Sequence, residues 1–145
     1  TMSNLLVQNI KHTNNTTSMT VDTSGQVSVR GEGSATTTNL QQGLAKLWCH
    51  LDMNTENTID DSFNTSSIAD RSTGKITVTA TNAMASINYT SVGGCWNGSS
   101  DNYGRFVSPD EARTTTVVKQ TTVTGTTNPL LDCQDVDIIN FGDLA

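Results

Sequence analysis

The sequence feature that most limits the fold of this chain is a strict alternation of apolar and polar residues. In residues 44–53 every second position is apolar: Ala45, Leu47, Cys49, Leu51 and Met53. The positions between them hold Lys46, Trp48, His50 and Asp52. Because successive side chains of a β-strand point to opposite faces, this alternation predicts a half-buried strand. Residues 75–81 repeat the pattern, with Ile76, Val78 and Ala80 on one face.

Several further segments have strand or turn character. We expect strands around Ser62-Phe63-Asn64 within residues 59–68, and in residues 89–96, 113–123 and 131–139. Between the strands we expect a turn at 70–74, an irregular bridge with at most one helical turn at 82–88, and a loop at 97–110. Short strands separated by frequent turns predict an all-β domain, a small antiparallel β-sandwich that is jelly-roll-like. Its inward-facing residues should include Leu47, Leu51, Phe63, Ile76 and Val78.

The composition supports strands joined by loops. The 145 residues include 25 threonines, 14 asparagines, 14 serines and 11 glycines. Threonine is β-branched and suits a pleated, half-exposed surface, whereas Asn, Ser and Gly suit turns. Only 15% of the residues are charged, so the chain lacks the charge-rich composition of disordered proteins. The length allows one domain with a modest core, plus an arm or tail.

Residues 1–42 differ from the rest and predict an extended N-terminal arm ahead of a β-sandwich domain at 43–145. Two short alternating runs, at 19–22 and 27–30, flank Ser24-Gly25 and predict a hairpin. Residues 31–38 resemble a flexible connector. Two strands alone cannot bury a core, so the arm needs a partner, which is the body, a neighbouring subunit or another protein. We therefore expect the arm to serve assembly or attachment.

The charge of the chain argues against several classes of partner. The formal net charge is −6, and the eight Lys and Arg residues are scattered rather than clustered. Binding to a nucleic-acid backbone requires clustered cations, so we expect no nucleic-acid partner. No apolar run approaches the roughly 20 residues of a membrane span, so we expect no membrane insertion. The N-terminus also lacks the layout of a secretory signal, although a mature secreted chain would lack it too.

The cysteines and acidic residues predict neither a metal nor a cofactor. Cys49, Cys95 and Cys133 are an odd number of widely spaced cysteines, without the paired spacing of a zinc site. We expect buried free thiols, which fits assembly in a reducing cytoplasm; one disulfide plus a free thiol is the alternative. A calcium site could draw on Asp60, Asp61, Asp132, Asp135 and Asp137, but a solvated acidic face is the simpler interpretation. Alternation places His50 and Cys49 on opposite faces, so they should not act together.

The candidate binding site is the segment 93–106, in which aromatic residues stand among flexible polar ones. Aromatic rings can stack on the apolar face of a sugar, and amides, carboxylates and guanidinium groups can bind its hydroxyls. The alternative is structural: Trp96 and Phe106 would be core residues at strand ends, joined by a solvated loop. The residues that we expect to contact a glycan or receptor are Trp96, Asn97, Asp101, Asn102, Tyr103 and Arg105.

Residues 43–90 carry a longer pattern of strand and turn residues. It consists of Lys46-x-Trp48, Asp61-Ser62-Phe63-Asn64-x-Ser66-Ser67-Ile68-x-Asp70, Thr73-Gly74-x-x-Thr77-Val78, Ala83-Met84 and Asn88-Tyr89. In order and spacing it resembles a domain that recurs in tail-fibre and other virion proteins of tailed bacteriophages, many of them marine. The resemblance implies a location in the virion and assembly as a homotrimer.

The sequence therefore predicts a non-enzymatic structural protein of a bacteriophage virion, a component of a fibre or surface appendage. It would be assembled in the host cytoplasm, pair with itself as a homotrimer and contact other virion proteins through the arm. One alternative is a receptor-binding module for host surface glycan, and another is a filament-forming surface protein of a microbe. An enzyme, such as a small glycan hydrolase, is the remaining alternative, since the separation of two catalytic carboxylates is set in space. The chain has no nucleophile elbow and no phosphate-binding glycine loop.

Overall fold

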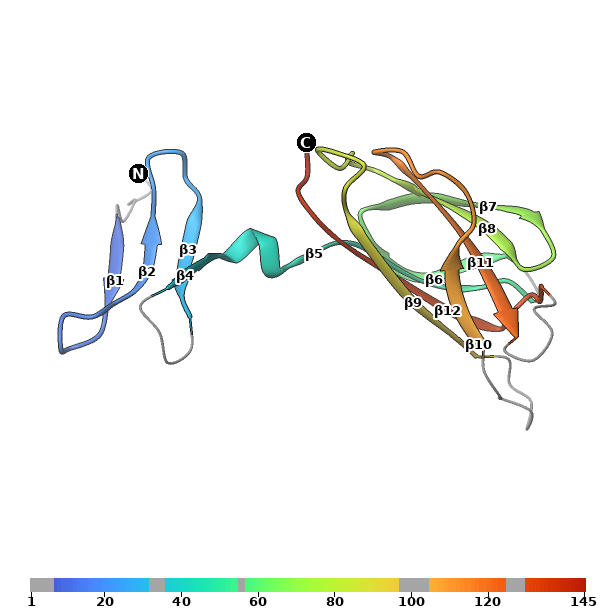
Figure 1. Ribbon diagram of the computed structural model, residues 1–145, viewed down its shortest axis with the longest axis horizontal. Helices are drawn as coiled ribbons and strands as arrows, with labels where there is room; N and C mark the ends of the chain where they lie inside the picture. Colours follow the sequence, from blue (N-terminus) through green and yellow to red (C-terminus); the bar gives the residue numbers. More distant parts are fainter. Residues whose placement is uncertain (1–6, 32–35, 55–56, 97–104, 125–129) are drawn as a thin grey trace, which may run out of the picture. The chain divides into compact units, whose positions relative to one another are not determined.

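The computed structural model describes residues 7–31, 36–54, 57–96, 105–124 and 130–145, with only the backbone of Arg105, Phe106 and Thr124. These residues form an all-β structure of three four-stranded sheets, as expected from the alternation (Figure 1). All of the strand pairs in these ranges are antiparallel, and no sheet that they form closes into a barrel. A jelly-roll connectivity is not shown specifically. The chain divides into two compact units, Thr1–Leu44 and Ala45–Ala145.

The N-terminal unit is a single sheet of four short strands in the order β1-β2-β3-β4. The predicted hairpin is confirmed as β2 and β3, and its turn is closed by Asp22, whose Oδ1 accepts hydrogen bonds from the amides of Ser24 at 2.8 Å and Gln26 at 2.9 Å. Residues 32–35 of the expected connector lie outside the described residues, but Thr37 and Thr38 belong to a strand. The strands are β1 (Asn9–Lys11), β2 (Thr17–Val21), β3 (Val27–Arg30) and β4 (Thr37–Asn39), followed by a 3₁₀ turn, η1 (Leu40–Gly43).

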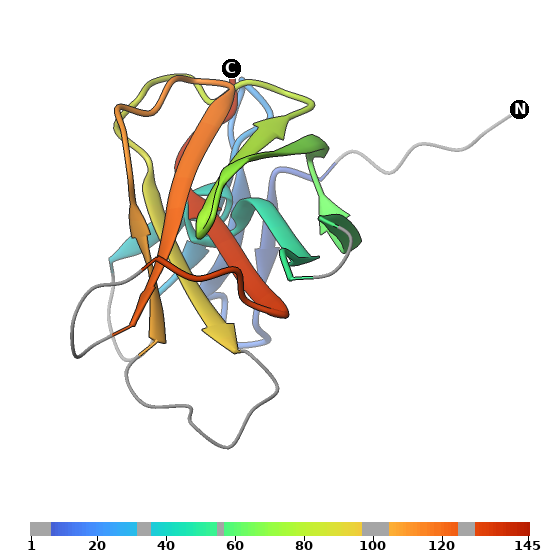
Figure 2. The same cartoon turned by 90° about the vertical axis from the view of Figure 1, so that its right-hand side faces the viewer.

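The body consists of two sheets, ordered β6-β5-β12-β9 and β10-β11-β8-β7, which face each other across a common core (Figure 2). The two strands predicted from alternation are confirmed as β5 and β8, and the expected strand at 89–96 as β9. The bounds are β5 (Ala45–Asp52), β6 (Thr58–Phe63), β7 (Thr65–Ser72), β8 (Lys75–Ala80), β9 (Thr90–Trp96), β10 (Arg105–Pro109), β11 (Val117–Thr124) and β12 (Asp135–Phe141).

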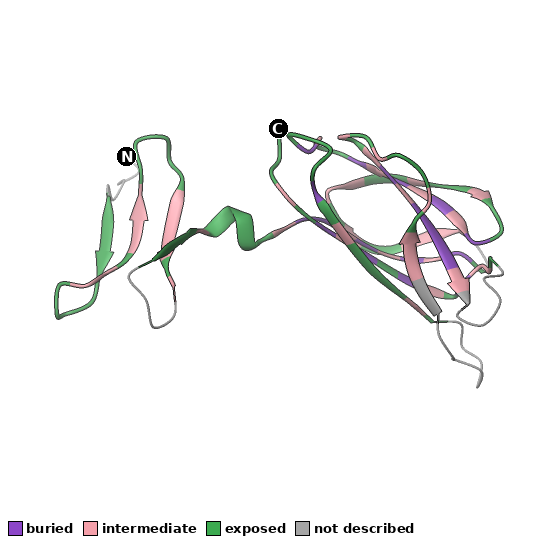
Figure 3. Cartoon of the chain, in the orientation of Figure 1, coloured by how far each residue is buried: buried purple, intermediate pink, exposed green. Residues whose placement is uncertain are grey.

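The core of the body lies between its two sheets (Figure 3). Leu47 and Leu51 from one sheet and Ile76 and Val78 from the other are fully buried, as predicted. Val136 and Ile138 of β12 are buried beside them. Burial of one such aliphatic side chain contributes about 1.5–3 kcal/mol. The N-terminal unit has no equivalent, because none of its described residues is buried.

Phe63 was predicted to face inward, and this prediction is wrong: half of its surface is exposed. Phe63 lies directly opposite Trp48 on β5, and directly opposed residues share a face of the sheet. Since Trp48 alternates outward from the core, Phe63 points outward with it. The expected single strand through residues 59–68 is also interrupted at Asn64. Asn64 adopts a left-handed backbone conformation with φ of 57°, and the chain passes there from β6 to β7 in the other sheet.

Other predicted boundaries shift for local reasons. Arg105–Pro109, expected within a loop, is strand β10 paired with β11. The strand expected from residue 113 begins at Val117, whose amide is capped by the Thr114 hydroxyl at 3.0 Å. The expected last strand at 131–139 begins only at residue 135 and continues to 141. Residues 82–88 contain no helical turn, and Met84 instead forms a β-bridge with Leu144.

Candidate functional site

An apolar row crosses the outer face of the sheet β6-β5-β12-β9. The strand register places one residue of each strand in this row: Phe63, Trp48, Ile139 and Val92. Neighbouring strands lie about 4.8 Å apart, so the row is about 14 Å long. Phe63 and Val92, at its two ends, are exposed by 50% and 49%, and the two central residues are partly exposed. Apolar side chains of this size in one row on the outside of a sheet form a surface suited to contact with another molecule.

An acidic cluster lies beside this row, centred on His50, which is the next outward residue of β5. The His50 Nδ1 atom is 2.8 Å from Oδ1 of Asp137, which is directly opposite on β12. Its Nε2 atom is 3.8 Å from a carboxylate oxygen of Asp60 and 3.7 Å from one of Asp135. The hydrogen bond with Asp137 raises the pKa of His50; partial burial opposes this shift, and the charges of the three carboxylates support it. The imidazole therefore holds a proton more tightly than a free histidine does.

On β9 the residue opposite Asp137 is Gly94, so the outer face has no side chain at this position. A Cβ atom added to Gly94 would meet no other atom within 4 Å, which shows that the space above the strand is open. A depression of about 230 Å³ is lined by Trp48, Asp137 and Ile139, together with parts of Cys49 and Ile138. The face thus combines an apolar ridge, an adjacent hollow and carboxylates that accept hydrogen bonds.

Of the predicted site residues, only the first is fully described. Trp96 is the last residue of β9, is 46% exposed, and lies opposite Asp135 on the outer side of the sheet. The structural alternative, with Trp96 in the core, is therefore wrong. Arg105 begins β10, but its side chain is not described. Asn97, Asp101, Asn102 and Tyr103 lie outside the described residues.

The acidic residues suggested for calcium are only partly brought together. Asp60, Asp135 and Asp137 converge on His50, whereas Asp132 accepts a hydrogen bond of 2.6 Å from the amide of Gly74 and fixes the β7–β8 turn. In the described part of the chain, no group of three or more His, Cys, Asp and Glu residues is arranged to hold a metal ion. The cluster is therefore best described as carboxylates around an imidazole.

All three cysteines are free, and they do not form a reactive site with His50. Cys49 and Cys133 are buried and Cys95 is partly buried. Burial raises the pKa of the Cys49 thiol to about 11, and the Thr65 hydroxyl opposes this shift only in part. A thiol with such a pKa stays protonated and unreactive near neutral pH. The expectation of opposite faces is confirmed, since Cys49 is in the core while His50 is outside.

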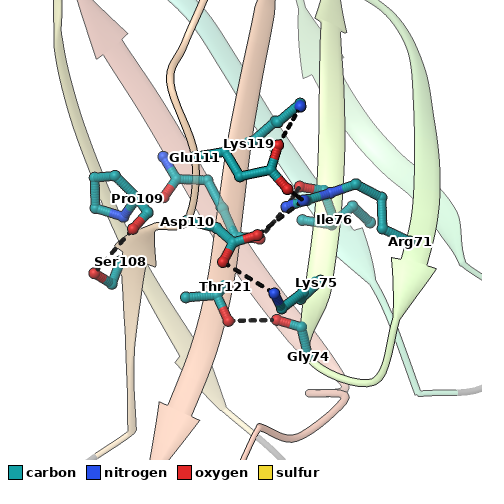
Figure 4. A network of polar contacts seen from close by, with 11 residues as sticks. Arg71, Gly74, Lys75, Ile76, Ser108, Pro109, Asp110, Glu111, Lys119 and Thr121 are labelled. Atoms are coloured by element: carbon teal, nitrogen blue, oxygen red, sulfur yellow. Dashed lines mark hydrogen bonds and ion pairs between the residues drawn. The ribbon is translucent and has the colours of Figure 1, made fainter.

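A second charged cluster lies on the sheet β10-β11-β8-β7 and connects its strands (Figure 4). The guanidinium of Arg71 lies 2.8 Å from Asp110 and 2.9 Å from Glu111, and Lys75 lies 3.2 Å from Asp110. Lys119 completes the cluster by contacting Glu111. Burial acts to raise the pKa of Asp110, but the hydrogen bonds from Arg71 and Lys75 outweigh it and hold the pKa below its ordinary value. Since these ion pairs join Asp110 and Glu111 to cations on three strands, the cluster fixes the segment after β10 to β7, β8 and β11.

A wider, shallow hollow of about 590 Å³ lies along residues 87–89 and 109–113. Its polar groups already contact one another. The guanidinium of Arg113 covers the Tyr89 ring at 5.0 Å and donates to the Tyr89 carbonyl oxygen, and the Tyr89 hydroxyl donates to the Thr114 carbonyl at 3.1 Å. This arrangement holds the start of β11 against the start of β9.

Comparisons with known proteins add no relative: no family model, no curated protein and no solved structure matches this chain. No helix among the described residues is long and apolar enough to cross a bilayer. Sequence reasoning identified Trp48 and His50 as outward-facing. It could not show that Phe63, Ile139 and Asp137 align with them, because that register is set by pairing between distant strands.

Proposed function

We propose that this protein is a non-enzymatic structural subunit of a bacteriophage virion, part of a fibre or surface appendage, and that it assembles as a homotrimer through its N-terminal unit. The observation that carries the proposal is the single-layer sheet β1–β4, which has an apolar face that no second layer formed by the described residues of its unit covers. A stable sheet buries its apolar face against a second layer. The N-terminal unit is therefore suited to assembly.

The strand register defines the two faces of this sheet. Ile10, Met19 and Val29 lie opposite one another on β1, β2 and β3, and Val21 pairs with Val27 on the same face. The other face is polar: it carries Asn9, Thr20, Ser28 and Asn39, with the Thr20 hydroxyl donating to the Asn9 side chain at 3.0 Å. The sheet thus has the pattern of one half of a two-layered structure.

The charge distribution favours further copies of this chain as the occupant of the apolar face. Within residues 1–44, Lys11 and Arg30 balance Asp22 and Glu32, so the formal net charge of −6 belongs entirely to residues 45–145. Copies of the N-terminal unit can therefore meet without net repulsion, whereas the acidic bodies repel one another. This difference supports the proposal that copies of the chain meet at the N-terminal sheet.

The virion setting is supported by the residue pattern at 43–90, which resembles phage fibre proteins. The described residues of the body form eight strands in two sheets, a layout that jelly rolls of viral capsid and lectin domains share, and we propose a jelly-roll-like sandwich as the finer description. The three free thiols suit assembly in the reducing host cytoplasm, with other virion proteins as further partners of the N-terminal unit. A filament-forming surface protein of a microbe would use the same kind of contact.

A receptor-binding module for host glycan is the second candidate function. The observation that favours it is the exposed Trp96 at the end of β9, which is followed in the sequence by the proposed contact residues Asn97, Asp101, Asn102, Tyr103 and Arg105. Adsorption of folded Trp96→Ala protein to host cells tests this candidate. Unchanged adsorption would leave assembly as the proposed function.

Native mass spectrometry of the full chain at micromolar concentration tests the assembly proposal, and we expect a trimer. Val29→Asp places a charge on the apolar face and should convert the trimer to monomer, because an unpaired buried carboxylate is strongly unfavourable. Ser28→Asp is the matched control: it adds the same charge one residue away, on the polar face, and should leave the trimer intact. A monomeric native chain would overturn the proposal. So would an oligomer that Val29→Asp and Ser28→Asp affect equally.

A further inference from the structure

We propose that the outer face of the sheet β6-β5-β12-β9 is a binding site for a saccharide without acidic groups, either neutral or amine-bearing. This inference goes beyond assembly and does not depend on the oligomeric state. Trp96, the described residue of the second candidate function, lies on the same outer face opposite Asp135, whereas the contacts proposed here are made by Trp48, Phe63 and Asp137. The site consists of the apolar row through Trp48 and Phe63 and the acidic cluster around His50.

The apolar row supplies the surface for stacking. Trp48 and Phe63 are directly opposed on neighbouring strands, so their rings lie on the same side of the sheet and next to each other. The flat C–H face of a pyranose is apolar, and its slightly positive hydrogens are attracted to the negative face of an aromatic ring. The row is about 14 Å long, which gives room for more than one sugar ring. The 230 Å³ depression lined by Trp48 and Asp137 adjoins this platform.

The acidic cluster supplies the polar contacts and the selectivity. One oxygen of Asp137 is bonded to His50, but a carboxylate has about four acceptor positions, so Asp137 can also accept from a sugar hydroxyl or ammonium group. The Asp137 side chain is 64% exposed and that of Asp60 is 48% exposed, so both are accessible. A saccharide that carries carboxylate or sulfate groups would be repelled by the same residues.

A second copy of the chain fits this face less well than a saccharide does. If two copies met on this face, each would bring its own carboxylates toward those of the other, and like charges at an interface are costly. The face is also small. Four strands of about seven residues cover roughly 400 Å², about half of what each partner contributes to a standard protein interface. A small, hydroxyl-rich ligand brings no carboxylates of its own and needs only a small area of contact.

The test is an NMR titration of the full chain at pH 6 with three oligosaccharides of similar length: a neutral glucan, a glucosamine oligomer and an oligogalacturonate. The two indole N–H signals are assigned with Trp48→Phe protein. We expect the neutral and amine-bearing probes to shift the Trp48 signal with millimolar affinity, and the anionic probe to bind at least about tenfold more weakly. If neither the neutral nor the amine-bearing probe shifts it at tens of millimolar, or if the anionic probe binds equally well, the proposal is wrong.

Three variants locate the binding. Phe63→Ala removes an exposed ring of the row and should weaken binding about tenfold while the protein stays folded. Ile87→Ala is the matched control, because Ile87 is also exposed (56%) but lies outside this face, and it should leave binding unchanged. Asp137→Asn keeps the shape and removes a charge, so it should reduce the preference for the glucosamine oligomer over the neutral glucan. Equal binding by native, Phe63→Ala and Asp137→Asn proteins would overturn the proposal.

Discussion

The two units of this chain are built from the same kind of sheet but differ in what covers it. Each of the three sheets has four antiparallel strands. In the body, two sheets share a core of thirteen buried apolar residues, and its strands are five to eight residues long. In the N-terminal unit the strands have three to five residues, and none of the described residues is buried. In both units the sheets are built around strands in which apolar and polar residues alternate. Only a unit whose sheet packs against a second layer has a core and can be stable on its own.

The same comparison explains why the two units carry different surfaces. The body has its core inside, so its outer face can combine an apolar row with carboxylates that point into solvent. The N-terminal sheet has one polar face, and its apolar face lacks any charged group opposite Met19, Val21, Val27 and Val29. One surface suits a small polar ligand, and the other suits a second protein layer. Matched changes in the two units test this contrast.

The largest expected effect comes from separating the units. Residues 45–145 alone should fold, because their core is complete, and should be monomeric. Residues 1–44 alone should remain unfolded in dilute solution, since a single sheet of short strands cannot bury enough apolar surface. Far-UV circular dichroism and native mass spectrometry of both fragments measure this. A fragment 1–44 that is folded and monomeric would contradict the conclusion that the N-terminal sheet needs a second layer.

Truncation of one apolar side chain in each unit is the next test. Leu47→Ala should cost about 2–5 kcal/mol in the unfolding free energy of the body, because Leu47 is fully buried. Val29→Ala should leave this free energy unchanged, since Val29 lies in the other unit. Phe63→Ala should cost less than about 1 kcal/mol, as a surface substitution. Urea unfolding curves of the three variants provide the measurement, and a large loss with Phe63→Ala would contradict the outward placement of this ring.

Two hairpin glycines offer a matched backbone test. Gly25 and Gly74 both have positive φ, of 79° and 68°, so alanine is strained at either position. A Cβ at Gly74 would also lie 2.6 Å from the Leu131 amide nitrogen, whereas one at Gly25 would meet nothing within 4 Å. Gly74→Ala should therefore destabilise the body by about 1–3 kcal/mol, and Gly25→Ala should not change the melting of the body. Equal melting curves for the two variants would show that the β7–β8 turn is looser than described.

The smallest expected effect is a change in the melting temperature of the body with pH. It can be tested by replacing His50 in the body and, for comparison, His12 in the N-terminal unit. Because the pKa of His50 is raised in the folded state, its stabilising contribution is complete below the unfolded pKa of about 6.5 and is lost as the pH rises through the folded pKa. The melting temperature of the body should therefore fall slightly between about pH 6 and pH 8. His50→Gln should remove this fall, and His12→Gln in the N-terminal unit should not. If the melting temperature of His50→Gln protein still falls over this pH range, the fall is due to another titrating group.

Alternation was sufficient to predict those strands whose own residues alternate between apolar and polar. The inward residues of β5 and β8, and the hairpin of β2 and β3, follow from local sequence alone. The short strands β1 and β4 were not predicted, because their Asn- and Thr-rich residues have no apolar alternation and become strands only by pairing with β2 and β3. The direction of Phe63 was mispredicted for a similar reason, since its partner on β5 decides it.

The candidate site was less predictable than the fold. The apolar row requires one residue from each of four strands, and the register between them depends on two bulges, in the pairs β5–β6 and β5–β12. The cluster around His50 joins residues 50, 60, 135 and 137, which lie far apart in the sequence. The burial of the polar residue Asn140 also could not be predicted from the pattern of apolar and polar residues. It is fully buried, and neither the nitrogen nor the oxygen of its side-chain amide has a hydrogen-bond partner among the described residues.

The position of β12 has a consequence for the order in which the protein is made. β12 is the last strand of the body to leave the ribosome, yet it lies between β5 and β9 at the centre of its sheet. Until it emerges, β9 has no partner strand in that sheet and β5 has an unpaired edge, a state prone to aggregation. The four strands of the N-terminal sheet all lie within residues 9–39, ahead of every strand of the body. In the proposed assembly, nascent chains on one messenger can therefore associate through these sheets before any body has folded.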